Sequence, residues 1–582
     1  MSKRRGRRTK RRAPVGLIIV IVLICIVIGA GIFVLSITNK GSEETVDLNS
    51  YYKLTAHTVT DDNGEKTEYA EPNEDEIAIV LDQDVLDERA VLQDNIAYLP
   101  YSVVRDKIDS RFYYDYINNI LIVTNATQKI TSESGESGYA VDGEAFTTEH
   151  PVSMIENEQV YISTEFVDKF SSAESVLAEN PGRVYVKAQT GTVKEGTIAS
   201  NTQIREAAGN KNAIVAEVSK GTEITVYESE DGWAKVVDAS GYVGYVSDGK
   251  IQASDTERVS SYEEPEYTHI LADGKINMLW YGVYYWGQDA EIQTEGAEVT
   301  GINVISPRWY SLNDTEGGIE VYSNSDFMTY ASEKGWQVWA MIDDVDQSFV
   351  DAVLVDSNKR DAVINTIVTD AVNEGVKGLN VDFERITTET GDDFIEFIRE
   401  LSIKCRQQGL ILSVDNYTPY SYNDCYHVDE QNQCVDYVTI MAYDNYLGTD
   451  TQGPNSSVDF LNEVMEVTLE KADEDRLIIG LPFYSRIWYT ATDGTVSSEE
   501  YTMADTKSVI EANGGSWAWD DSTGMNYASF DYDGGHINCW IEDADSIKAK
   551  LDFLSKYNIA GVAWWTLGQE TSDVWAVISQ YY

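Results

Sequence analysis

Eight short apolar segments, separated by stretches with helical periodicity, fill residues 270–582 and constrain the fold more than any other feature. Strands that alternate with helices are typical of a parallel sheet covered by helices. Eight such units in about 313 residues predict an α/β fold, a (β/α)8 TIM barrel. The candidate strands are 276–283, 302–307, 337–342, 378–384, 410–415, 437–443, 476–483 and 560–567. The candidate helices include 358–375, 391–407 and 458–473. The long interval 488–555 predicts an inserted subdomain or loop.

Three polar residues interrupt the fourth segment, whose sequence is GLNVDFE. Asn380, Asp382 and Glu384 alternate with apolar residues, so the two-residue period of a strand places all three side chains on one face. We call these three residues the polar ladder. In a barrel that face points inward, and the ladder ends where barrel enzymes carry their chemistry. Two neighbouring carboxyl groups there are expected to have raised pKa values, which suits a general acid. The alternative is a ladder with a purely structural role.

Motifs on three strands together resemble glycoside hydrolase family 18. In GLNVDFE, Glu384 matches the family's catalytic acid and Asp382 matches the aspartate that precedes it. The sequence Met-Ala-Tyr-Asp at 441–444 resembles the family's Met-x-Tyr-Asp motif, and Trp565 matches the tryptophan beneath the sugar. The three motifs occur in the family's order on the expected strands. The resemblance covers nearly all of 270–582.

The resemblance implies a retaining, substrate-assisted hydrolysis in which the substrate's own 2-acetamido group attacks the anomeric carbon. Glu384 would protonate the leaving oxygen, Asp382 would orient the acetamido N–H, and Tyr443 would donate to the acetamido oxygen. The predicted substrate-binding residues are Asn380, Asp444, Trp565 and Met441, of which Met441 fits a barrel core equally well. Three aromatic residues near strand ends fit either a sugar groove or loop packing, namely Trp309, Tyr417 and Tyr446. The reaction implies an N-acetylated glycan as substrate, with no cofactor and no metal.

Two departures from the family pattern narrow the expected substrate. The family's first two motif aspartates are replaced by Lys377 and Asn380, and residues 338–344 read VWAMIDD where many chitinases have Ser-x-Gly-Gly. Both departures resemble the branch of spore-cortex and cell-wall N-acetylglucosaminidases. We therefore expect hydrolysis of β-1,4 bonds after N-acetylglucosamine in peptidoglycan. The alternatives are a chitinase-like hydrolase of other N-acetylglucosaminyl glycans and a non-catalytic scaffold that binds wall glycan.

The N-terminal segment predicts a membrane anchor. The first twelve residues hold eight Lys or Arg, and the 23 residues of 15–37 include no charged side chain. As a helix with about 1.5 Å rise per residue, 15–37 would reach roughly 34 Å, which is enough to cross a bilayer. The excess of cations places residues 1–14 in the cytoplasm. We expect a single-pass protein of the cell membrane with a linker at 38–72 and an extracellular catalytic region.

Two accessory modules are expected between the linker and the barrel. In 73–189 the order strand, short helix, strand occurs twice, which loosely resembles the copper amine oxidase N-terminal-type domain and implies an α+β spacer or binding module without oxidase chemistry. Residues 192–253, with Trp233 and the run GYVGYV, resemble the bacterial SH3 domain. That small β-barrel often binds wall peptides, so a wall peptide is a candidate partner; the alternative is a spacer. Residues 254–269 are expected to be a second linker.

Composition excludes several classes of protein. A net charge of −55 excludes a general nucleic-acid binder, because contacts with phosphate need a basic surface. The five His show no metal-ligand spacing, and five Cys are too few for a disulfide-dense scaffold. Cys425 and Cys434 are nine residues apart and could form a local disulfide. The alternative is that both are free thiols. Cys405 and Cys539 lie near apolar runs and are expected in a core.

Overall fold

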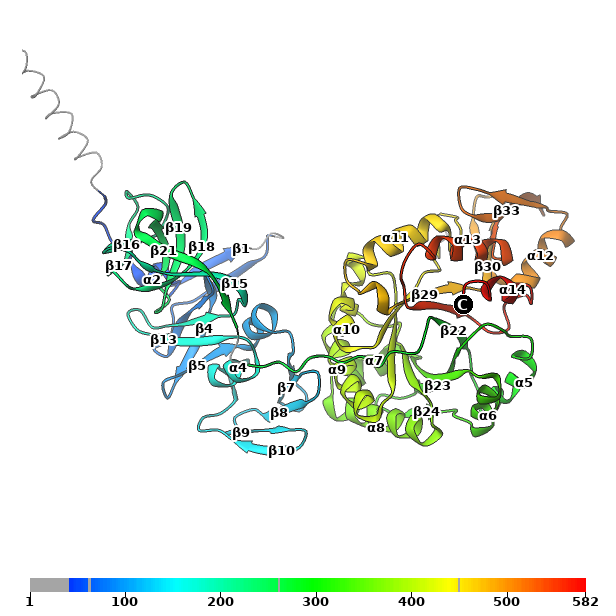
Figure 1. Cartoon of the computed structure of the whole chain (residues 1–582), viewed down its shortest axis with the longest axis horizontal. Coiled ribbons are helices and arrows are strands. Elements are labelled where there is room, and N and C mark those ends of the chain that lie inside the picture. The colour runs from blue at the N-terminus through cyan, green and yellow to red at the C-terminus, as the bar shows by residue number, and fades with distance from the viewer. Residues whose placement is uncertain (1–40, 61–63, 260–261, 448–450) are drawn as a thin grey trace, which may run out of the picture. The chain divides into compact units, whose positions relative to one another are not determined.

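The computed structural model describes residues 41–60, 64–259, 262–447 and 451–582 (Figure 1). The chain folds as two compact units. The first holds the described residues up to Ile108 together with Met154–Glu263, and the second holds Asp109–Ser153 and Glu264–Tyr582. The predicted membrane span, 15–37, lies outside the described residues. Within the described ranges, no helix is both long enough and apolar enough to cross a membrane.

A seven-stranded mixed sheet forms one layer of the first unit, in the order β11-β12-β5-β4-β3-β14-β13. Its strands are β3 (Glu76–Leu81), β4 (Asp84–Gln93), β5 (Ile96–Pro100), β11 (Ser153–Glu156), β12 (Gln159–Ser163), β13 (Glu174–Ala178) and β14 (Arg183–Lys187). The predicted short helices follow two of these strands, α3 (Tyr101–Val103) after β5 and α4 (Thr164–Phe170) after β12. The Ser163 side chain caps α4 by accepting a hydrogen bond from the Phe166 amide. The resemblance of this region to the copper amine oxidase N-terminal-type domain stays a prediction.

The second sheet of this unit covers the segment expected to be an SH3 domain, in the order β17-β16-β20-β19-β18-β15-β21. Its strands are β15 (Gly191–Ile198), β16 (Thr202–Arg205), β17 (Ile214–Val218), β18 (Glu223–Glu230), β19 (Trp233–Asp238), β20 (Val243–Ser247) and β21 (Ile251–Arg258). Alternating Val and Ile side chains supply its core, with Ile204, Val236 and Val246 fully buried. This alternation is what a sheet with one buried face requires.

The two stretches expected to be linkers are partly structured. Residues 38–72 carry α2 (Leu48–Tyr51) and the hairpin of β1 (His57–Thr60) with β2 (Lys66–Tyr69). Tyr52 is 1% exposed because its ring packs among the strands of the second sheet, and its hydroxyl donates to the Gly241 carbonyl at 3.0 Å. Strand β21 continues through Arg258, five residues into the expected second linker, because β15 offers it an antiparallel partner along its whole length.

The second unit contains the barrel, and all eight predicted strands are present. They are β22 (Ile276–Tyr281), β23 (Val304–Leu312), β25 (Gln337–Asp344), β26 (Gly378–Asp382), β27 (Ile411–Asn416), β28 (Tyr437–Met441), β29 (Leu477–Pro482) and β35 (Gly561–Trp565). All eight are parallel, and β22 closes the barrel by pairing with both β23 and β35. The short β24 (Ile319–Val321) adds an antiparallel strand beside β23. This arrangement confirms the predicted barrel.

Helices cover the outside of the barrel (Figure 1). They include α5 (Ile292–Glu295), α6 (Ser325–Lys334), α7 (Gln347–Leu354), α8 (Ser357–Glu374), α9 (Gly391–Gln408), α10 (Val428–Cys434), α11 (Val458–Thr468), α13 (Ala544–Leu554) and α14 (Val574–Ile578). The core between strands and helices is aliphatic and aromatic, and a second core fills the inside of the barrel with Met278, Trp280, Trp339 and Met341. The Cys residues of this unit, Cys405, Cys425, Cys434 and Cys539, are all free thiols, and Cys405 and Cys539 are buried as expected.

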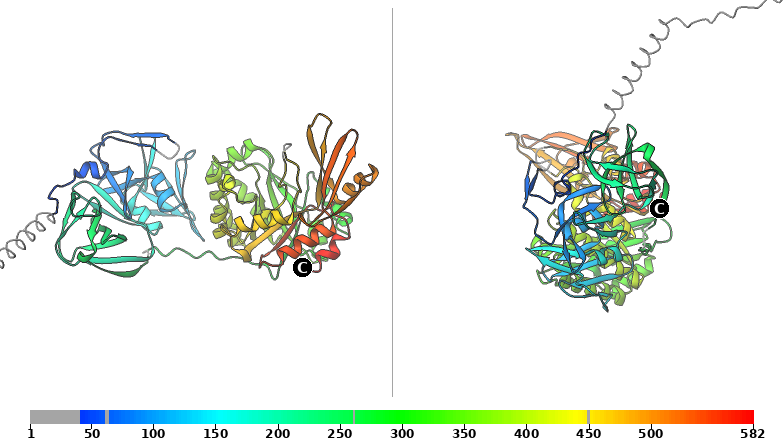
Figure 2. Two further views of the ribbon diagram at one scale, coloured as in Figure 1. Left: turned by 90° about the horizontal axis from the view of Figure 1, so that it is seen from above. Right: turned by 90° about the vertical axis from the view of Figure 1, so that its left-hand side faces the viewer.

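The predicted insertion is a small subdomain between β29 and β35. Its five-stranded sheet has the order β31-β30-β34-β33-β32 and is joined by α12 (Met503–Ala512). Its strands are β30 (Tyr484–Thr490), β31 (Val496–Thr502), β32 (Trp517–Asp520), β33 (Met525–Tyr532) and β34 (Gly535–Ile541). The left view of Figure 2 shows these orange strands standing beside the barrel. A core of its own, centred on Ile510, Cys539 and Ile541, holds the subdomain together.

Residues 109–153 form a further sheet that belongs to the barrel unit. The order is β10-β9-β8-β7-β6, with β6 (Phe112–Asp115), β7 (Ile120–Thr124), β8 (Lys129–Glu133), β9 (Gly138–Val141) and β10 (Glu144–Thr147). The Tyr113 hydroxyl donates to Asp393 at 2.6 Å, and Lys129 pairs with Glu400 at 3.2 Å. Glu400 also pairs at 3.0 Å with Arg360, whose side chain is fully buried. The sheet thus covers a charged surface of α8 and α9, so these charges lie inside the unit.

Candidate active site

A cavity of about 270 Å³ lies at the carboxyl ends of the barrel strands. Strand β26 brings Asp382 to it and Glu384 follows two residues later; β28 brings Met441, with Tyr443 two residues beyond it, and β35 brings Trp565. Seven further residues line it, namely Trp280, Asp415, Tyr417, Asp444, Leu447, Tyr484 and Glu500. Six of the seven predicted site residues therefore meet in one cavity, and Asn380 is the exception.

Asn380 lies below the cavity, inside the barrel, where it is fully buried and hydrogen-bonded through both ends of its amide. Its Oδ1 accepts from the indole N–H of Trp280 at 2.9 Å and from the Ser306 hydroxyl at 3.2 Å. Its Nδ2 donates to Ser413 at 3.0 Å and to the Asp415 carboxylate at 2.9 Å. The side chain predicted to bind substrate is therefore fully occupied with neighbouring strands, and it orients Trp280 and Asp415 instead.

The two carboxyl groups of the ladder lie in a setting that disfavours negative charge. Burial raises the pKa of Asp382 well above its ordinary value, and the neighbouring carboxylates of Glu384 and Asp415 raise it further. Within the described residues, Oδ1 of Asp382 is buried without a hydrogen-bond partner. Burial also raises the pKa of Asp415, to about 7. An unpaired buried carboxyl oxygen is costly, and a catalytic role is one of the reasons for which such a group is kept.

Glu384 is fixed from two sides. Its side chain accepts a hydrogen bond from the Tyr417 hydroxyl, and its backbone N–H donates to Asp344 at 3.2 Å. Burial raises the pKa of Glu384, although the bond from Tyr417 opposes that shift because it stabilises the carboxylate. The buried Asp344 carboxylate also accepts from the Arg385 amide at 2.8 Å, so it fixes the turn that follows β26.

Four aromatic residues that line the cavity meet in two pairs. The rings of Trp280 and Trp565 meet edge to face, with centroids 6.0 Å apart and planes inclined by 63°. Tyr443 and Tyr484 meet in the same manner at 6.3 Å. Burial raises the pKa of Tyr443 well above its ordinary value, so its hydroxyl keeps its proton and remains a donor. Rings arranged in this way offer flat apolar faces and polar tips, which suits a sugar ring.

The inserted subdomain supplies one charged wall. Asp444 pairs with Arg486 at 3.2 Å, and the same guanidinium nitrogen of Arg486 pairs with Glu500 at 2.7 Å. The backbone of Asp444 has a positive φ of 56°, and its N–H donates to the Asn455 side chain at 2.8 Å. Asp444 therefore projects from a fixed turn, and Arg486 couples it to the carboxylate of Glu500 on β31.

Sequence reasoning missed several lining residues. Asp415 ends the fifth strand run, LILSVD, and its place there is the same signal that identified Asp382. Trp280 lies in an apolar strand run, so its sequence context does not distinguish it from a core residue. Glu500 lies in the insertion, where no periodic pattern indicates that it faces the cavity. Of the three aromatic candidates, Tyr417 lines the cavity, whereas Trp309 is fully buried and packs against Phe327 at 5.2 Å. Tyr446 is not a lining residue.

No group of three or more His, Cys, Asp and Glu residues is arranged to hold a metal ion in the part of the chain that the structure describes. The acidic side chains of the cavity instead make hydrogen bonds with Asn380, Tyr417 and Arg486. What the arrangement offers a ligand is an unpaired carboxyl oxygen, a second carboxyl with a raised pKa, and aromatic faces.

Comparison with known families identifies two domains in the chain. Residues 282–570 match the model of glycosyl hydrolases family 18, and residues 200–252 match the model of the bacterial SH3 domain. The barrel is therefore a glycosyl hydrolase family 18 domain, a glycan hydrolase fold preceded by an SH3 domain. Both family predictions are confirmed.

Individual relatives are distant. The chain is 24% identical over 265 residues to the uncharacterized glycosylase YvbX of Bacillus subtilis, a match that covers 43% of this chain and 76% of that protein. It is 23% identical over 241 residues to the cortical fragment-lytic enzyme of Bacillus subtilis, covering 40% of this chain and 55% of that protein. Among solved structures, the C-terminal domain of a putative chitinase from Desulfitobacterium hafniense aligns with a TM-score of 0.48 and 18% identity, over 53% of this chain and 99% of that one.

Proposed function

We propose that the barrel hydrolyses β-1,4 bonds after N-acetylglucosamine in peptidoglycan, with retention of configuration and with participation of the substrate's acetamido group. The environment of Asp382 carries this proposal. One of its carboxyl oxygens is buried and unpaired within the described residues, and Asp382 lines the same cavity as Glu384 and Trp565. A secondary amide in the sugar bound there would supply the missing hydrogen bond, and a 2-acetamido group has one.

In the proposed first step, Glu384 gives its proton to the glycosidic oxygen as the bond to the anomeric carbon breaks. The acetamido carbonyl oxygen forms a bond to that carbon and gives a cyclic oxazolinium ion, while Asp382 accepts a hydrogen bond from the acetamido N–H. The leaving sugar departs as an alcohol carrying the proton of Glu384. The Tyr443 hydroxyl donates to the acetamido oxygen and holds it in position for attack.

In the second step, water enters in place of the leaving sugar. The Glu384 carboxylate takes a proton from this water as its oxygen bonds to the anomeric carbon, and the bond to the acetamido oxygen breaks. The acetamido group is restored, Glu384 is protonated again, and two displacements at one carbon give net retention. Burial supports this cycle, because a raised pKa keeps a larger fraction of Glu384 protonated near neutral pH.

The wider setting supports a wall-derived glycan as the substrate. The relative named cortical fragment-lytic enzyme points to this class, and the SH3 domain is a candidate for contact with wall peptide. The basic residues of 1–14 and the uncharged segment 15–37 support a membrane anchor that holds the barrel outside the cell. A net charge of −55 favours a solvated surface protein over one that binds polyanions.

The test is mass spectrometry of products released from purified peptidoglycan by the full-length chain in detergent. The Glu384→Gln variant is compared with Glu389→Gln, which changes an exposed carboxylate five residues further along. We expect the native chain and Glu389→Gln to release fragments with N-acetylglucosamine at the new reducing end. We expect Glu384→Gln to release them about 10²–10⁴-fold more slowly while it still sediments with the wall.

Two results would change the conclusion. Release from chitin oligomers, with none from peptidoglycan, would move the substrate to other N-acetylglucosaminyl glycans. Wall binding without release from either glycan would favour a scaffold. Fragments that end in another sugar at the new reducing end would contradict the proposed bond.

A further inference from the structure

The sheet of residues 109–153 lies on the barrel without a covalent connection to it. The chain enters this sheet from Ile108 and leaves it into Met154, and both of these residues belong to the first unit. Strands β7 and β8 nevertheless lie against α8 and α9, with which they line a cavity of about 510 Å³. Non-covalent contacts alone therefore keep the sheet on the barrel, so a change in these contacts can release it.

A cluster of charged side chains lies in this interface, and each of its cations has a carboxylate of its own. The pairs are Arg360 with Glu400 at 3.0 Å, Lys129 with Asp361 at 3.1 Å, and Arg399 with Glu430. Glu400 also lies 3.2 Å from Lys129, so the pairs form one connected network. Three cations thus meet three carboxylates, and their charges cancel.

Glu396 of α9 is a fourth carboxyl group in the cluster, and the described residues leave no cation for it alone. It is fully buried, and its Oε1 has no hydrogen-bond partner among the described residues. Its Oε2 accepts from the Thr124 hydroxyl of β7 at 3.3 Å and lies 3.5 Å from Arg399, which also pairs with Glu430. An ionised Glu396 therefore adds one uncompensated charge to a buried interface, which is costly.

The charges around Glu396 act on its protonation in opposite directions. Burial and the negative charge of Glu400 raise its pKa from an ordinary value of 4.5 to about 7. The cations that oppose this shift are Arg399, Arg360 and Lys129. Because each of these cations is already paired, their combined effect is smaller than that of burial.

The elements packed around the cluster bring further titratable groups, none of which supplies a free cation. These groups are Tyr113 beside Arg360, Tyr267 and Cys434 beside Arg399, and His427 beside Glu430. Burial raises the pKa of both phenols and of the thiol, so these three carry no charge near neutral pH. His427 has a carboxylate of its own in Asp392, at 3.3 Å.

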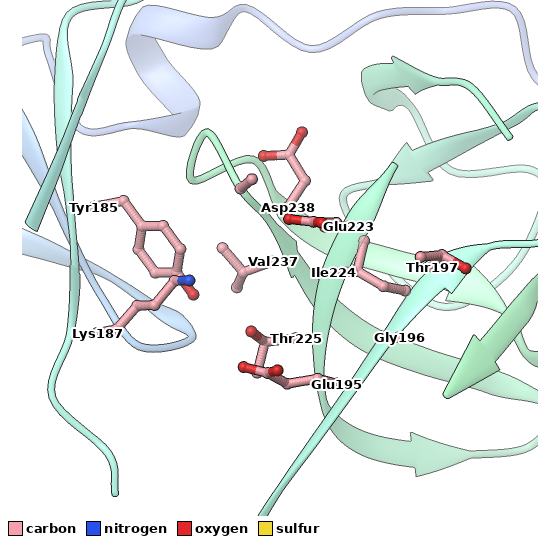
Figure 3. A pocket seen from close by; sticks show the side chains of 11 residues that line it. Tyr185, Lys187, Glu195, Gly196, Thr197, Glu223, Ile224, Thr225, Val237 and Asp238 are labelled. Carbon is pink, nitrogen blue, oxygen red and sulfur yellow. The ribbon is translucent and has the colours of Figure 1, made fainter. Parts of the chain in front are cut away.

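Other carboxylates without a cation occur among the described residues, but they are in contact with water. Glu223 is exposed and Glu195 is half-buried where both line the cavity of about 400 Å³ in Figure 3. Water can solvate either charge there. Glu396 differs because the sheet covers its carboxyl group through Thr124, so solvation of its charge requires the sheet to move away from α9. Ionisation of Glu396 is thereby linked to the opening of this interface.

We propose that Glu396 is a pH-sensitive latch for the sheet of residues 109–153. With its proton, the carboxyl group is neutral and the sheet stays on α8 and α9. When the proton leaves to solvent, the unpaired charge favours an open arrangement, in which water solvates the carboxylate and Thr124 no longer covers it. No other bond forms or breaks in this step.

The sign and the size of the effect follow from the two pKa values of Glu396. A carboxyl group with a raised pKa in the closed arrangement favours closure fully below its ordinary pKa, and this contribution is lost as the pH rises through the raised value. With a pKa of about 7 when closed and 4.5 when open, the equilibrium constant for closure falls about 30-fold between pH 5.5 and pH 8.5. The sheet should therefore open more often at the higher pH.

The amide of Ser357 reports on this interface directly. It begins α8, and it donates to the Asp115 carboxylate of β6 at 2.9 Å, so its exchange with solvent requires the sheet to leave α8. The test is hydrogen–deuterium exchange of the full-length chain in detergent at pH 5.5 and pH 8.5, read residue by residue by mass spectrometry. Dividing the intrinsic exchange rate at each pH by the measured rate gives a protection factor.

We expect the protection factor of Ser357 to fall at least tenfold from pH 5.5 to pH 8.5 in the native chain. Glu396→Gln keeps a neutral side chain at both pH values, so its protection should fall less than twofold. Glu389→Gln changes an exposed carboxylate near the start of the same helix and should behave as the native chain does. Equal protection of the native chain at the two pH values, or a fall that Glu396→Gln shares, would overturn the proposal.

Thr124→Val tests the latch without replacing the carboxyl group, and it decides the question if Glu396→Gln does not fold. The variant loses the hydroxyl that donates to the carboxylate, so Glu396 should ionise at a higher pH. The protection of Ser357 should then fall at a higher pH than in the native chain, and a fall at the same or a lower pH would contradict the latch. Exchange is measured without substrate, so the outcome is independent of the proposed glycan hydrolysis.

Discussion

Asn380 offers the sharpest test of the geometry below the candidate active site, because the family pattern has a carboxylate at this position. Asn380→Asp changes one atom of the side chain and removes both donors of the amide. The lost bond to Ser413 is worth about 0.5–1.5 kcal/mol, and the lost bond to the Asp415 carboxylate about 1.5–3 kcal/mol. The variant should therefore lose about 2–4.5 kcal/mol of the free energy of unfolding at pH 8, above the pKa of about 7 that burial gives Asp415 in the native chain.

The loss should depend on pH in a direction that the structure fixes. Burial raises the pKa of Asp415 to about 7, so at pH 5 this group carries a proton in the folded chain. It can then donate to the new carboxylate, and the penalty should fall to about 1 kcal/mol. A group with a raised folded pKa contributes stability at low pH and loses it as the pH rises through that pKa, so the native chain should itself be less stable at pH 8 than at pH 5.

Chemical denaturation at the two pH values measures both effects. The signal is the fluorescence of the tryptophans inside the barrel, and Ser413→Ala is the matched control. That variant loses one neutral hydrogen bond, so it should be destabilised by about 1 kcal/mol at both pH values. An Asn380→Asp chain as stable as the native one at pH 8, or equally destabilised at both pH values, would refute the hydrogen-bond directions assigned to the polar ladder.

Three further predictions concern the second unit. Glu384→Gln should lower kcat by about 10²–10⁴-fold, with bound glycan retained, as measured by glycan release and wall sedimentation. Tyr417→Phe removes the hydrogen bond that lowers the pKa of Glu384, so the alkaline limb of the pH–rate profile should move to higher pH; movement to lower pH would contradict the general-acid role. Arg360→Met leaves Glu400 buried without its main partner and should cost about 3–5 kcal/mol of stability. Its control Lys548→Met, at an exposed pair, should cost under about 1 kcal/mol in the same melting experiment.

The barrel could be predicted because its signal is local and repeated. Each strand is a short buried run, each helix has a 3.6-residue period, and parallel strands buried on both faces read as continuous apolar segments. The polar ladder could be predicted because it interrupts such an apolar segment. Asp382 and Glu384 are charged residues at positions where the two-residue period of a strand requires inward-facing side chains. The same reasoning applied to LILSVD would have found Asp415.

Contacts between distant segments could not be predicted in this way. Glu500 reaches the cavity because the insertion folds back beside the barrel. The sequence around Glu500 has no hydrophobic periodicity from which this contact could be predicted. The sequence places Trp309 near a predicted strand end, which fits either a groove or loop packing. In the structure β23 continues to Leu312, and the ring is buried against Phe327 of α6. The sheet of residues 109–153 joins the barrel unit through Tyr113 and Lys129, whose partners lie more than 200 residues away.

The departure at Asn380 need not count against catalysis. A third carboxylate between Asp382 and Asp415 would add negative charge to a buried site where burial and neighbouring carboxylates already raise both pKa values. The amide instead gives Asp415 a donor and accepts from Trp280, so it stabilises one neighbour and orients the ring of another. It makes no hydrogen bond with Oδ1 of Asp382, which has no partner among the described residues. In the proposed mechanism the acetamido N–H donates to that oxygen, so an amide at 380 is compatible with the chemistry as long as Asp382 and Glu384 are both present.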